Sequence, residues 1–175
     1  TQNGVRGGSA TVHFPIWHQE IEDILVLKNN KGTEDNRVRK LDYSIQLSKL
    51  FYERFINNED ITLFSPHEVP ELYETWGTDE FDDLYLKAER KISVKKTKVN
   101  AQELFFDMLK ERAETGRIYI MNIDHCNTHS SFKDRVYMSN LCQEITLPTD
   151  PLQHIDGNGE IALCILSAIN VGTID

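Results

Sequence analysis

Three side chains that could do chemistry together stand at alternate positions of one short segment, namely Asn140, Cys142 and Glu144. If the segment is an extended strand, these side chains project from one face, and the thiol lies about 6–7 Å from each neighbour. A carboxylate can act as a base, an amide can orient hydroxyl groups, and a thiol can act as a nucleophile or carry a radical. Short polar and apolar alternations are also common in ordinary strands, and a buried cysteine is usually inert. The spacing alone therefore leaves both a reactive and a structural role open.

The other two cysteines have simpler interpretations when the sequence is taken alone. Cys164 lies in the apolar run 161–166, where a small thiol suits the core of a buried strand. Cys126 and His129 are three residues apart in the polar cluster 124–129, a spacing that suggests a pair of metal ligands. A structural metal site needs four ligands, and no second pair stands at a suitable spacing. We therefore expect no metal, and instead a polar cluster at a strand end that hydrogen-bonds to neighbouring loops.

A glycine-rich stretch occupies residues 2–9 and contains Arg6. It lacks the Lys-Ser/Thr pair of a P-loop and the glycine spacing of a dinucleotide fingerprint. As a structural feature it is a flexible loop. As a functional feature, its glycines let the backbone pass close to a ligand while Arg6 contacts a phosphate or a base.

Charge and composition exclude several classes of function. The 175 residues include 19 Lys and Arg against 28 Asp and Glu, which gives a net charge of −9 and a pI near 5.1. This balance argues against binding nucleic-acid polymers or anionic membranes, because both need clustered basic side chains. No apolar run reaches the length of a membrane span, and the polar start does not resemble a signal peptide. The three cysteines form no disulfide or zinc pattern, so we expect a reduced, cytoplasmic protein.

The elements that must position these residues alternate between helices and strands. The clearest helix begins after Asn100, which with Glu103 resembles a capping box, and ends at Gly116, which supplies a left-handed stop. Apolar runs without polar alternation are typical of parallel strands that helices cover on both faces, so the predicted fold class is α/β. The expected helices are 16–27, 39–57, 79–91 and 101–115, and the expected strands are 118–123, 141–147 and 161–166, with a surface connection over 28–39.

The ends of the chain look unfinished. A glycine-rich loop stands at the start with no element ahead of it, and residues 168–175 bring no closing element. The length suggests one domain or a piece of one. We therefore expect residues 1–175 to be an internal segment of a larger domain, incomplete at both ends.

Taken together, the segments around these residues resemble the large, catalytic subunit of class I ribonucleotide reductase. The resemblance runs in order along essentially the whole chain. It implies an α/β fold that is an internal part of the ten-stranded catalytic barrel of that family, which agrees with the unfinished ends. The matching segments are residues 2–8, 18–22, 25–30, 60–67, 115–119 and 124–129, together with Ser139-Asn140-Leu141-Cys142-Gln143-Glu144-Ile145 and Gly159-Glu160-Ile161-Ala162-Leu163-Cys164.

The resemblance implies a role for individual residues in the reduction of ribonucleotides to deoxyribonucleotides for DNA synthesis. Cys142 aligns with the cysteine that becomes a thiyl radical and removes hydrogen from C3′ of the ribose. Glu144 aligns with the base that takes the 3′-hydroxyl proton, and Asn140 aligns with the amide that binds the ribose hydroxyls. Cys164 aligns with one of two cysteines that reduce the substrate radical and end as a disulfide. The residues expected to contact the substrate are Asn140, Leu141, Cys142, Gln143 and Glu144.

The resemblance also implies regulation and partners. Gln2 and Arg6 fall on the loop that relays the identity of a nucleoside triphosphate effector to the substrate base. No cofactor or metal is expected in this segment, because a metal-containing small subunit supplies the radical and a thioredoxin- or glutaredoxin-type protein supplies electrons. The expected partners are the remaining segments of the large subunit, the small subunit and a ribonucleoside diphosphate substrate. The complete subunit is expected to be a homodimer.

Two further interpretations compete with an enzyme segment. One is a non-catalytic barrel fragment that only binds a partner or a nucleotide, against which the intact set of Asn140, Cys142, Glu144 and Cys164 argues. The other is a glycyl-radical reductase, which shares the barrel but does not need the carboxylate of Glu144. The second redox cysteine would lie upstream of Thr1, so we expect the isolated chain to be inactive without the rest of the subunit.

Overall fold

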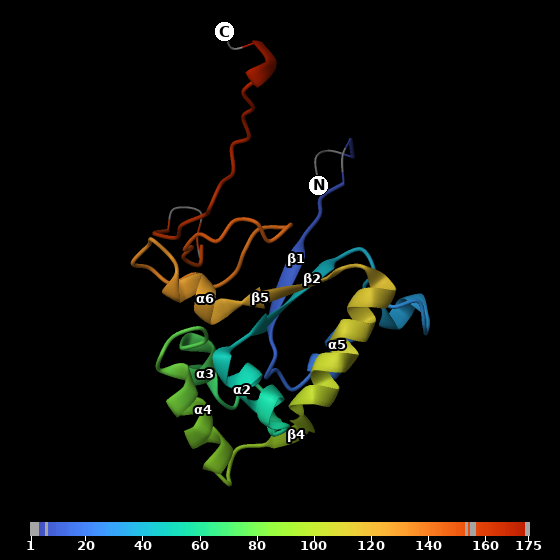
Figure 1. The fold of residues 1–175 in the computed structure, drawn as a ribbon, viewed down its shortest axis with the longest axis vertical. Coiled ribbons are helices and arrows are strands. Elements are labelled where there is room, and N and C mark those ends of the chain that lie inside the picture. Colours follow the sequence, from blue (N-terminus) through green and yellow to red (C-terminus); the bar gives the residue numbers. More distant parts are fainter. Residues whose placement is uncertain (1–3, 6, 153, 155–156, 174–175) are drawn as a thin grey trace.

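The centre of the fold is a three-stranded parallel sheet in the order β1-β2-β5, made of β1 (Thr11–Pro15), β2 (Asp42–Leu47) and β5 (Ile118–Asn122). A two-stranded antiparallel sheet joins β3 (Asp60–Phe64) to β4 (Lys96–Asn100). Parallel strands connected through helices confirm the predicted α/β class (Figure 1). The computed structural model describes residues 4–5, 7–152, 154 and 157–173.

The helices lie mostly on one side of the parallel sheet. In Figure 1, α2 to α5 fill the lower half of the molecule, whereas the segment after α6 lies in the upper half and ends in an extended arm. No helix in the described part of the chain is long and apolar enough to cross a membrane. The helices are α1 (Ile21–Leu25), α2 (Lys49–Asn57), α3 (Pro70–Glu74), α4 (Phe81–Arg90), α5 (Ala101–Thr115) and α6 (Ile123–Thr128), with short 3-10 helices at Glu34–Asn36 and Val171–Thr173.

The side chains of β2 alternate between an apolar face and a polar face of the parallel sheet. Tyr43, Ile45 and Leu47 belong to the hydrophobic core, which also contains side chains of α2 and α5. The alternate residues Ser44 and Gln46 point to the opposite face, and they are only 0% and 3% exposed. A buried polar side chain needs a hydrogen-bond partner, so a segment that supplies partners must cover this second face.

The predicted helix over 39–57 is wrong in its first half. Strand β2 occupies that half, and α2 begins only after Ser48, whose side chain caps the helix by accepting a hydrogen bond from Phe51 N. The helical spacing of Leu47 and Leu50 misled the prediction, although Ser44 and Gln46 alternate with apolar residues as in a strand.

The predicted helix over 16–27 is shorter than expected. Only α1 is helical, because the residues before it pair with β3 instead. Phe64 N donates to Trp17 O at 2.9 Å, and Gln19 N donates to Phe64 O at 2.8 Å. This pairing ties the end of β1 to the second sheet.

The helix predicted after Asn100 is confirmed as α5. Asn100 Oδ1 accepts hydrogen bonds from the N–H groups of Gln102 and Glu103, and Gly116 ends the helix with a φ of +70°. Helix α4 and strand β5 also lie where the sequence predicts them.

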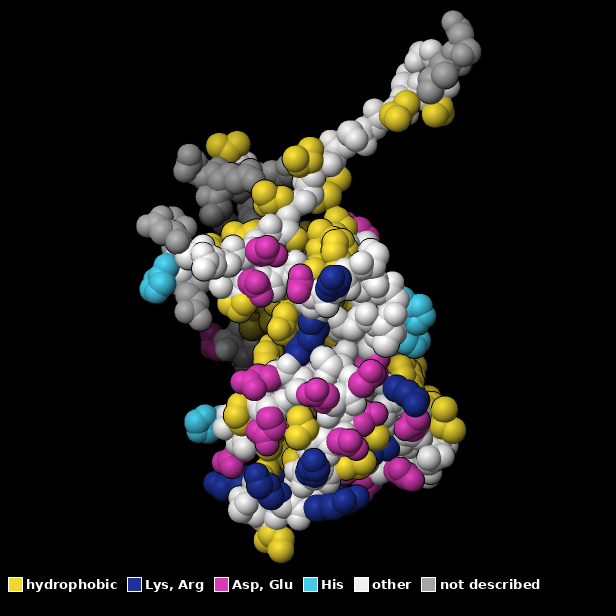
Figure 2. Space-filling model, turned by 90° about the vertical axis from the view of Figure 1, so that its left-hand side faces the viewer, with side chains coloured by type: hydrophobic (Ala, Val, Ile, Leu, Met, Phe, Trp, Pro, Cys, Tyr) yellow, Lys and Arg dark blue, Asp and Glu magenta, His cyan; other side chains and the backbone are white. Residues whose placement is uncertain are grey.

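The strands predicted over 141–147 and 161–166 are not formed in the described residues. The second of these segments is an exposed arm, in which the side chain of Ile165 is 93% exposed. Figure 2 shows hydrophobic side chains along this arm and around its base. A strand needs a neighbour to pair with its backbone, and in the described residues a single bridge between Asp150 and Glu160 stands near the arm.

The predicted surface connection over 28–39 is present, but it is anchored by buried polar side chains. Lys28 Nζ donates to Leu41 O at 2.5 Å and pairs with the carboxylate of Asp42 at the start of β2. Asn29 is 4% exposed, and its Oδ1 accepts a hydrogen bond from Arg37 Nε at 3.1 Å. The connection is therefore fixed against the amino end of the parallel sheet.

Candidate functional site

The segment 137–145, here called the Cys142 loop, covers the polar face of the parallel sheet. Side chains of β1 and β2 bind backbone carbonyl groups along this loop. Thr11 Oγ1 donates to Leu141 O at 2.6 Å, His13 Nε2 lies 3.1 Å from Ser139 O, and Gln46 Nε2 donates to Tyr137 O at 2.7 Å. The loop is therefore the cover that the buried polar face of the sheet requires.

Gln143 connects the middle of the Cys142 loop to two strands at once. Its Oε1 accepts a hydrogen bond from Ser44 Oγ at 2.5 Å, and its Nε2 donates to Ile120 O at 2.6 Å. The backbone of Gln143 has a φ of +63°, in the left-handed region that residues with a Cβ rarely occupy. The loop consequently turns at this residue.

Asn140 closes the same turn from the other side. Its Oδ1 accepts hydrogen bonds from Ile145 N at 3.0 Å and from Ser139 Oγ at 3.1 Å. Its backbone carbonyl accepts a hydrogen bond from Gln143 N at 3.2 Å. Because the amide oxygen holds the turn, the amino group of Asn140 is the part that can donate to a ligand.

The turn corrects the expectation that Asn140, Cys142 and Glu144 share one face of an extended strand. Alternation of side chains holds only for extended backbone, and the left-handed residue between Cys142 and Glu144 breaks it. Cys142 and Glu144 are both exposed, whereas Asn140 is half-buried. The thiol and the carboxylate are therefore accessible to a partner or a substrate.

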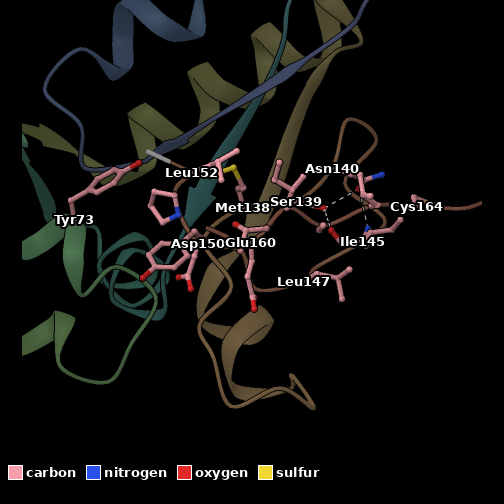
Figure 3. A pocket seen from close by; sticks show the side chains of 16 residues that line it. Tyr73, Met138, Ser139, Asn140, Ile145, Leu147, Asp150, Leu152, Glu160 and Cys164 are labelled. Atoms are coloured by element: carbon pink, nitrogen blue, oxygen red, sulfur yellow. Dashed lines mark hydrogen bonds between the residues drawn. The ribbon is translucent and has the colours of Figure 1, made fainter. Parts of the chain in front are cut away.

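A cavity of about 600 Å³ lies beside the Cys142 loop and is lined mainly by apolar side chains. Asn140 and Cys164 both line it, and Figure 3 shows them toward one end of the cavity, with Tyr73 toward the other. Cys142 and Glu144 are not among the lining residues. The structure thus brings two of the four predicted catalytic residues to one cavity and leaves the other two on the adjoining loop.

Cys164 does not occupy the core position that its apolar surroundings suggest. Its side chain is exposed, because residues 161–166 form an arm and not a buried strand. Within this chain Cys164 is therefore not a core cysteine. An exposed thiol at a cavity is open to chemistry.

The polar cluster 124–129 follows β5 and hydrogen-bonds to neighbouring segments, as expected, and most of it forms the helix α6. Asp124 Oδ2 accepts a hydrogen bond from Lys49 N at 2.5 Å, at the start of α2. Asn127 accepts from Val136 N at 2.8 Å and donates to Val136 O at 3.1 Å, just before the Cys142 loop. The described residues contain no group of three or more His, Cys, Asp or Glu side chains placed to hold a metal ion.

Burial changes the acidity of groups around the site. Burial raises the pKa of the Cys126 thiol, which keeps this cysteine protonated and weakly reactive. Burial raises the pKa of Asp124, although the hydrogen bond from Lys49 N opposes the change. Burial lowers the pKa of His13 despite its contact with Ser139 O, so neutral imidazole is favoured. A neutral His13 donates from Nε2 to the Cys142 loop without adding charge to it.

Sequence reasoning missed the residues that hold the loop, namely Thr11, His13, Ser44 and Gln46. One signal was available, because Ser44 and Gln46 are polar residues at alternate positions among apolar ones. That pattern predicts a strand with one polar face.

Gln2 and Arg6 lie outside the described residues. Strand β1 begins at Thr11, five residues after Arg6, so the glycine-rich segment leads into the strand that binds the Cys142 loop.

Comparison with known proteins gives a consistent result along the whole chain. A family model described as "Ribonucleotide reductase, barrel domain" matches residues 1–175. The chain is 58% identical to the ribonucleoside-diphosphate reductase subunit alpha of Haemophilus influenzae over 181 aligned residues, which is 100% of the chain and 24% of that protein.

Two other relatives show how widely this similarity extends. The Escherichia coli ribonucleoside-diphosphate reductase 1 subunit alpha is 57% identical over 87% of the chain and 21% of its own length. The corresponding alpha subunit of Enterobacteria phage T4 is 46% identical over 100% of the chain and 24% of its own length. The chain therefore spans about a quarter of the curated relatives that it matches.

Proposed function

Because the chain belongs to the ribonucleotide reductase barrel-domain family, we propose that it is a segment of a catalytic subunit that reduces ribonucleoside diphosphates to deoxyribonucleotides. One observation carries this proposal: Asn140 and Cys164 line one cavity, and the adjoining loop presents Cys142 and Glu144 to solvent. These are the four residues to which the family resemblance assigns roles in the reaction.

Each of the four residues has a separate task in the proposed reaction. Cys142, as a thiyl radical, takes the hydrogen atom from C3′ of the ribose, while Glu144 accepts the proton of the 3′-hydroxyl group. Asn140 donates a hydrogen bond from its free amino group to a ribose hydroxyl. Cys164 and a second thiol together supply two electrons and two protons and end as a disulfide. The 2′-hydroxyl group leaves as water, and Cys142 returns its hydrogen atom to C3′ and becomes a radical again.

The cavity suits this chemistry because its apolar lining limits access of water to a substrate radical. Its size is within the range of pockets that hold small ligands. Asn140 has an amide oxygen held by Ile145 N, so its amino group is oriented before a ribose arrives. Such prior orientation lowers the entropic cost of the reaction.

The proposal includes the partners and regulators that the reaction requires. A metal-containing small subunit generates the radical, and a thioredoxin- or glutaredoxin-type protein reduces the disulfide. Nucleoside triphosphate effectors act through the glycine-rich segment, where Gln2 and Arg6 adjust the choice of substrate base. The other segments of the large subunit complete the barrel, which we propose to be cytoplasmic and homodimeric.

The test is Cys142→Ser in the complete subunit that contains this segment. A hydroxyl group cannot form a comparable radical, so we expect no deoxyribonucleotide while the protein stays folded. Cys126→Ser is the matched control, because Cys126 is half-buried in α6 and has no task in the reaction. That control should keep turnover within about threefold of the unsubstituted subunit, as expected for a mild surface or core change.

Two outcomes would contradict the proposal. Turnover by folded Cys142→Ser would remove Cys142 from the radical step. A complete subunit without any reductase activity, but with a folded barrel that binds nucleotide, would favour the alternative of a non-catalytic barrel.

A further inference from the structure

We propose that Gln143 is a positioning residue that sets the conformation of the Cys142 loop through Ser44 and Ile120, and that its side chain does not contact the substrate. The inference rests on the function proposed above, because it concerns the same reaction. The family resemblance places Gln143 among the residues that contact the substrate, and the structure gives it a different task.

The backbone conformation of Gln143 must be stabilised by contacts with other parts of the chain. Its φ of +63° is unfavourable for a residue with a Cβ. Asn58 is the other non-glycine residue with a positive φ in the described chain, but it ends α2, where a left-handed residue is common. Gln143 lies in a loop, so tertiary contacts must hold it.

The side chain of Gln143 supplies those contacts. Ser44 Oγ donates to its Oε1 at 2.5 Å, and its Nε2 donates to Ile120 O at 2.6 Å. Only this orientation of the amide satisfies both partners, because the reverse would place Oε1 against the carbonyl oxygen of Ile120. The amide is therefore held between β2 and β5 in a single orientation.

Burial makes the contact with Ser44 difficult to replace with water. Ser44 is 0% exposed, so loss of the bond leaves a buried polar group without a partner. The amide of Gln143 points into the sheet, and Gln143 does not line the cavity that Asn140 and Cys164 share. Both polar atoms of the amide are bound to β2 and β5, so the side chain is held against the sheet, whereas the side chains of Cys142 and Glu144 are exposed.

The backbone conformation of Gln143 determines the orientation of both reactive groups, the thiol of Cys142 and the carboxylate of Glu144. It lies directly between Cys142 and Glu144, so a change of its backbone from left-handed to extended re-aims the thiol and the carboxylate together. The bonds from Thr11 and His13 hold other parts of the loop, at Leu141 and Ser139. Gln143 alone fixes the residue between the radical cysteine and the proposed base.

The experiment uses the complete subunit with Ser44→Ala and Gln143→Leu, singly and combined, and measures kcat and KM for a ribonucleoside diphosphate. Misplacing reactive groups by about 1 Å lowers turnover on the order of 100-fold, so we expect kcat to fall 10-fold to 100-fold with KM unchanged. The two substitutions remove the same bond, so their combined effect should be smaller than the product of the single effects.

A second measurement does not depend on activity. Amide hydrogen exchange over residues 139–145, without substrate, should become at least about tenfold faster in both single variants, because the loop loses a bond that holds it closed. Gln143→Leu lies in a loop and keeps the size of the side chain. It therefore decides the question if the buried Ser44→Ala variant does not fold.

Ser48→Ala is the matched control. It also removes a buried serine hydroxyl and one hydrogen bond, but that bond caps α2 and does not involve the Cys142 loop. It should leave kcat and exchange over 139–145 unchanged. An equal fall of kcat in Ser48→Ala would show a general folding effect and overturn the inference.

Failure of the inference differs from failure of the proposed function. A raised KM with unchanged kcat in Gln143→Leu would mean that Gln143 contacts the substrate, and unchanged kcat and KM would mean that it positions nothing. Both results require an active unsubstituted subunit. An inactive unsubstituted subunit would instead contradict the proposed function, and the exchange measurement would still test the contact between Gln143 and the sheet.

Discussion

The two proposed catalytic cysteines differ in how the fold holds them. Cys142 follows Leu141, whose carbonyl oxygen is bound by Thr11 of β1, so the backbone around its thiol is fixed by the sheet. Cys164 lies on the exposed arm, although it lines the same cavity as Asn140. A radical thiol must meet one hydrogen atom of the substrate, whereas a redox thiol must meet the substrate, its partner thiol and a reductant in turn.

We predict that Cys164→Ser in the complete subunit still permits hydrogen abstraction but stops reduction of the substrate intermediate. Cys142→Ser should leave the substrate unchanged, whereas Cys164→Ser should convert it into products that are not deoxyribonucleotides. Multiple turnover should fall at least about 1000-fold in both variants, since each removes an essential chemical group. Product analysis after incubation with the small subunit and reductant distinguishes the two. Normal turnover by Cys164→Ser would remove Cys164 from the mechanism.

At the scale of elements, an ion pair joins α2 to α4 next to β3. The guanidinium of Arg54 binds both carboxylate oxygens of Glu89, at 2.7 and 2.6 Å. Both side chains are mostly buried, at 12% and 15% exposed. Tyr85 OH donates to Thr62 O at 2.6 Å and accepts from Thr62 N at 2.7 Å. Three elements thus meet in one polar network beneath the sheet that carries the site.

We predict that this network weakens in acid. Burial alone would raise the pKa of Glu89, but the hydrogen bonds from Arg54 and Thr62 outweigh it and lower the pKa. A carboxylate with a lowered pKa in the fold stabilises it above its unfolded pKa of about 4.3, and this contribution is lost as pH falls through the folded pKa. Hydrogen exchange of β3 amides, corrected for the intrinsic rate, should therefore accelerate below about pH 4.3.

Glu89→Gln tests the same contribution at neutral pH. It should destabilise β3 by about 1.5–3 kcal/mol at pH 7, the typical contribution of a hydrogen bond to a charged group, and flatten the dependence on pH. An unchanged acid dependence in this variant would assign the effect to another group.

Gly77 and Gly116 form a natural pair for testing a close contact near the site. Both have positive φ, but a Cβ at Gly77 would lie 2.6 Å from the side chain of Ile123 and 2.9 Å from Asn127 Nδ2, whereas nothing lies within 4 Å at Gly116. We predict that Gly116→Ala costs about 1 kcal/mol from its backbone alone, and that Gly77→Ala costs at least about 2 kcal/mol more. Thermal unfolding of the two variants measures the difference. Equal losses would show that Ile123 and Asn127 move aside freely.

Elements with local signals were predictable, and those that depend on distant partners were not. Helix α5 is capped by Asn100 at its start and by Gly116 at its end, so local residues determine both of its limits. The Cys142 loop alternates like a strand, but its turn depends on Ser44, which is 99 residues away from Gln143. Spacing and composition do not separate Cys142 and Cys164 from ordinary cysteines. The roles proposed for them rest on the family resemblance alone.

At the scale of the whole molecule, the polar and apolar surfaces are unevenly distributed. On the face shown in Figure 2, charged side chains of both signs are scattered over the lower half, whereas hydrophobic side chains gather along the arm and around its base. On the arm, Leu163 is 82% exposed, Ile165 93% and Leu166 89%. Within the described residues, β1 and β5 each have a neighbour on one side alone. Open strand edges and an exposed apolar segment favour association with further polypeptide.

The last prediction is that a polypeptide of these 175 residues alone does not reduce ribonucleotides, even with a radical-generating subunit, reductant and effector. The reaction needs two thiols beside the 2′ carbon, and the chain has three cysteines. Cys142 is committed to the radical, and Cys126 is half-buried in α6 with a pKa raised by burial. Cys164 is then the one remaining thiol, which supplies half of the electrons. Deoxyribonucleotide formation by the purified polypeptide is the measurement.

Addition of the other three quarters of the subunit, as separate polypeptides, should restore turnover and also cover the arm. A strand paired on both sides exchanges its amides far more slowly than a solvated one, so exchange over residues 161–166 should slow by at least about 100-fold on addition. The Asn29–Arg37 contact at the amino end of the sheet is already formed, so the amides around it should change little. Multiple turnover by the 175-residue polypeptide alone would mean that the second redox thiol lies within it, with Cys126 as the candidate.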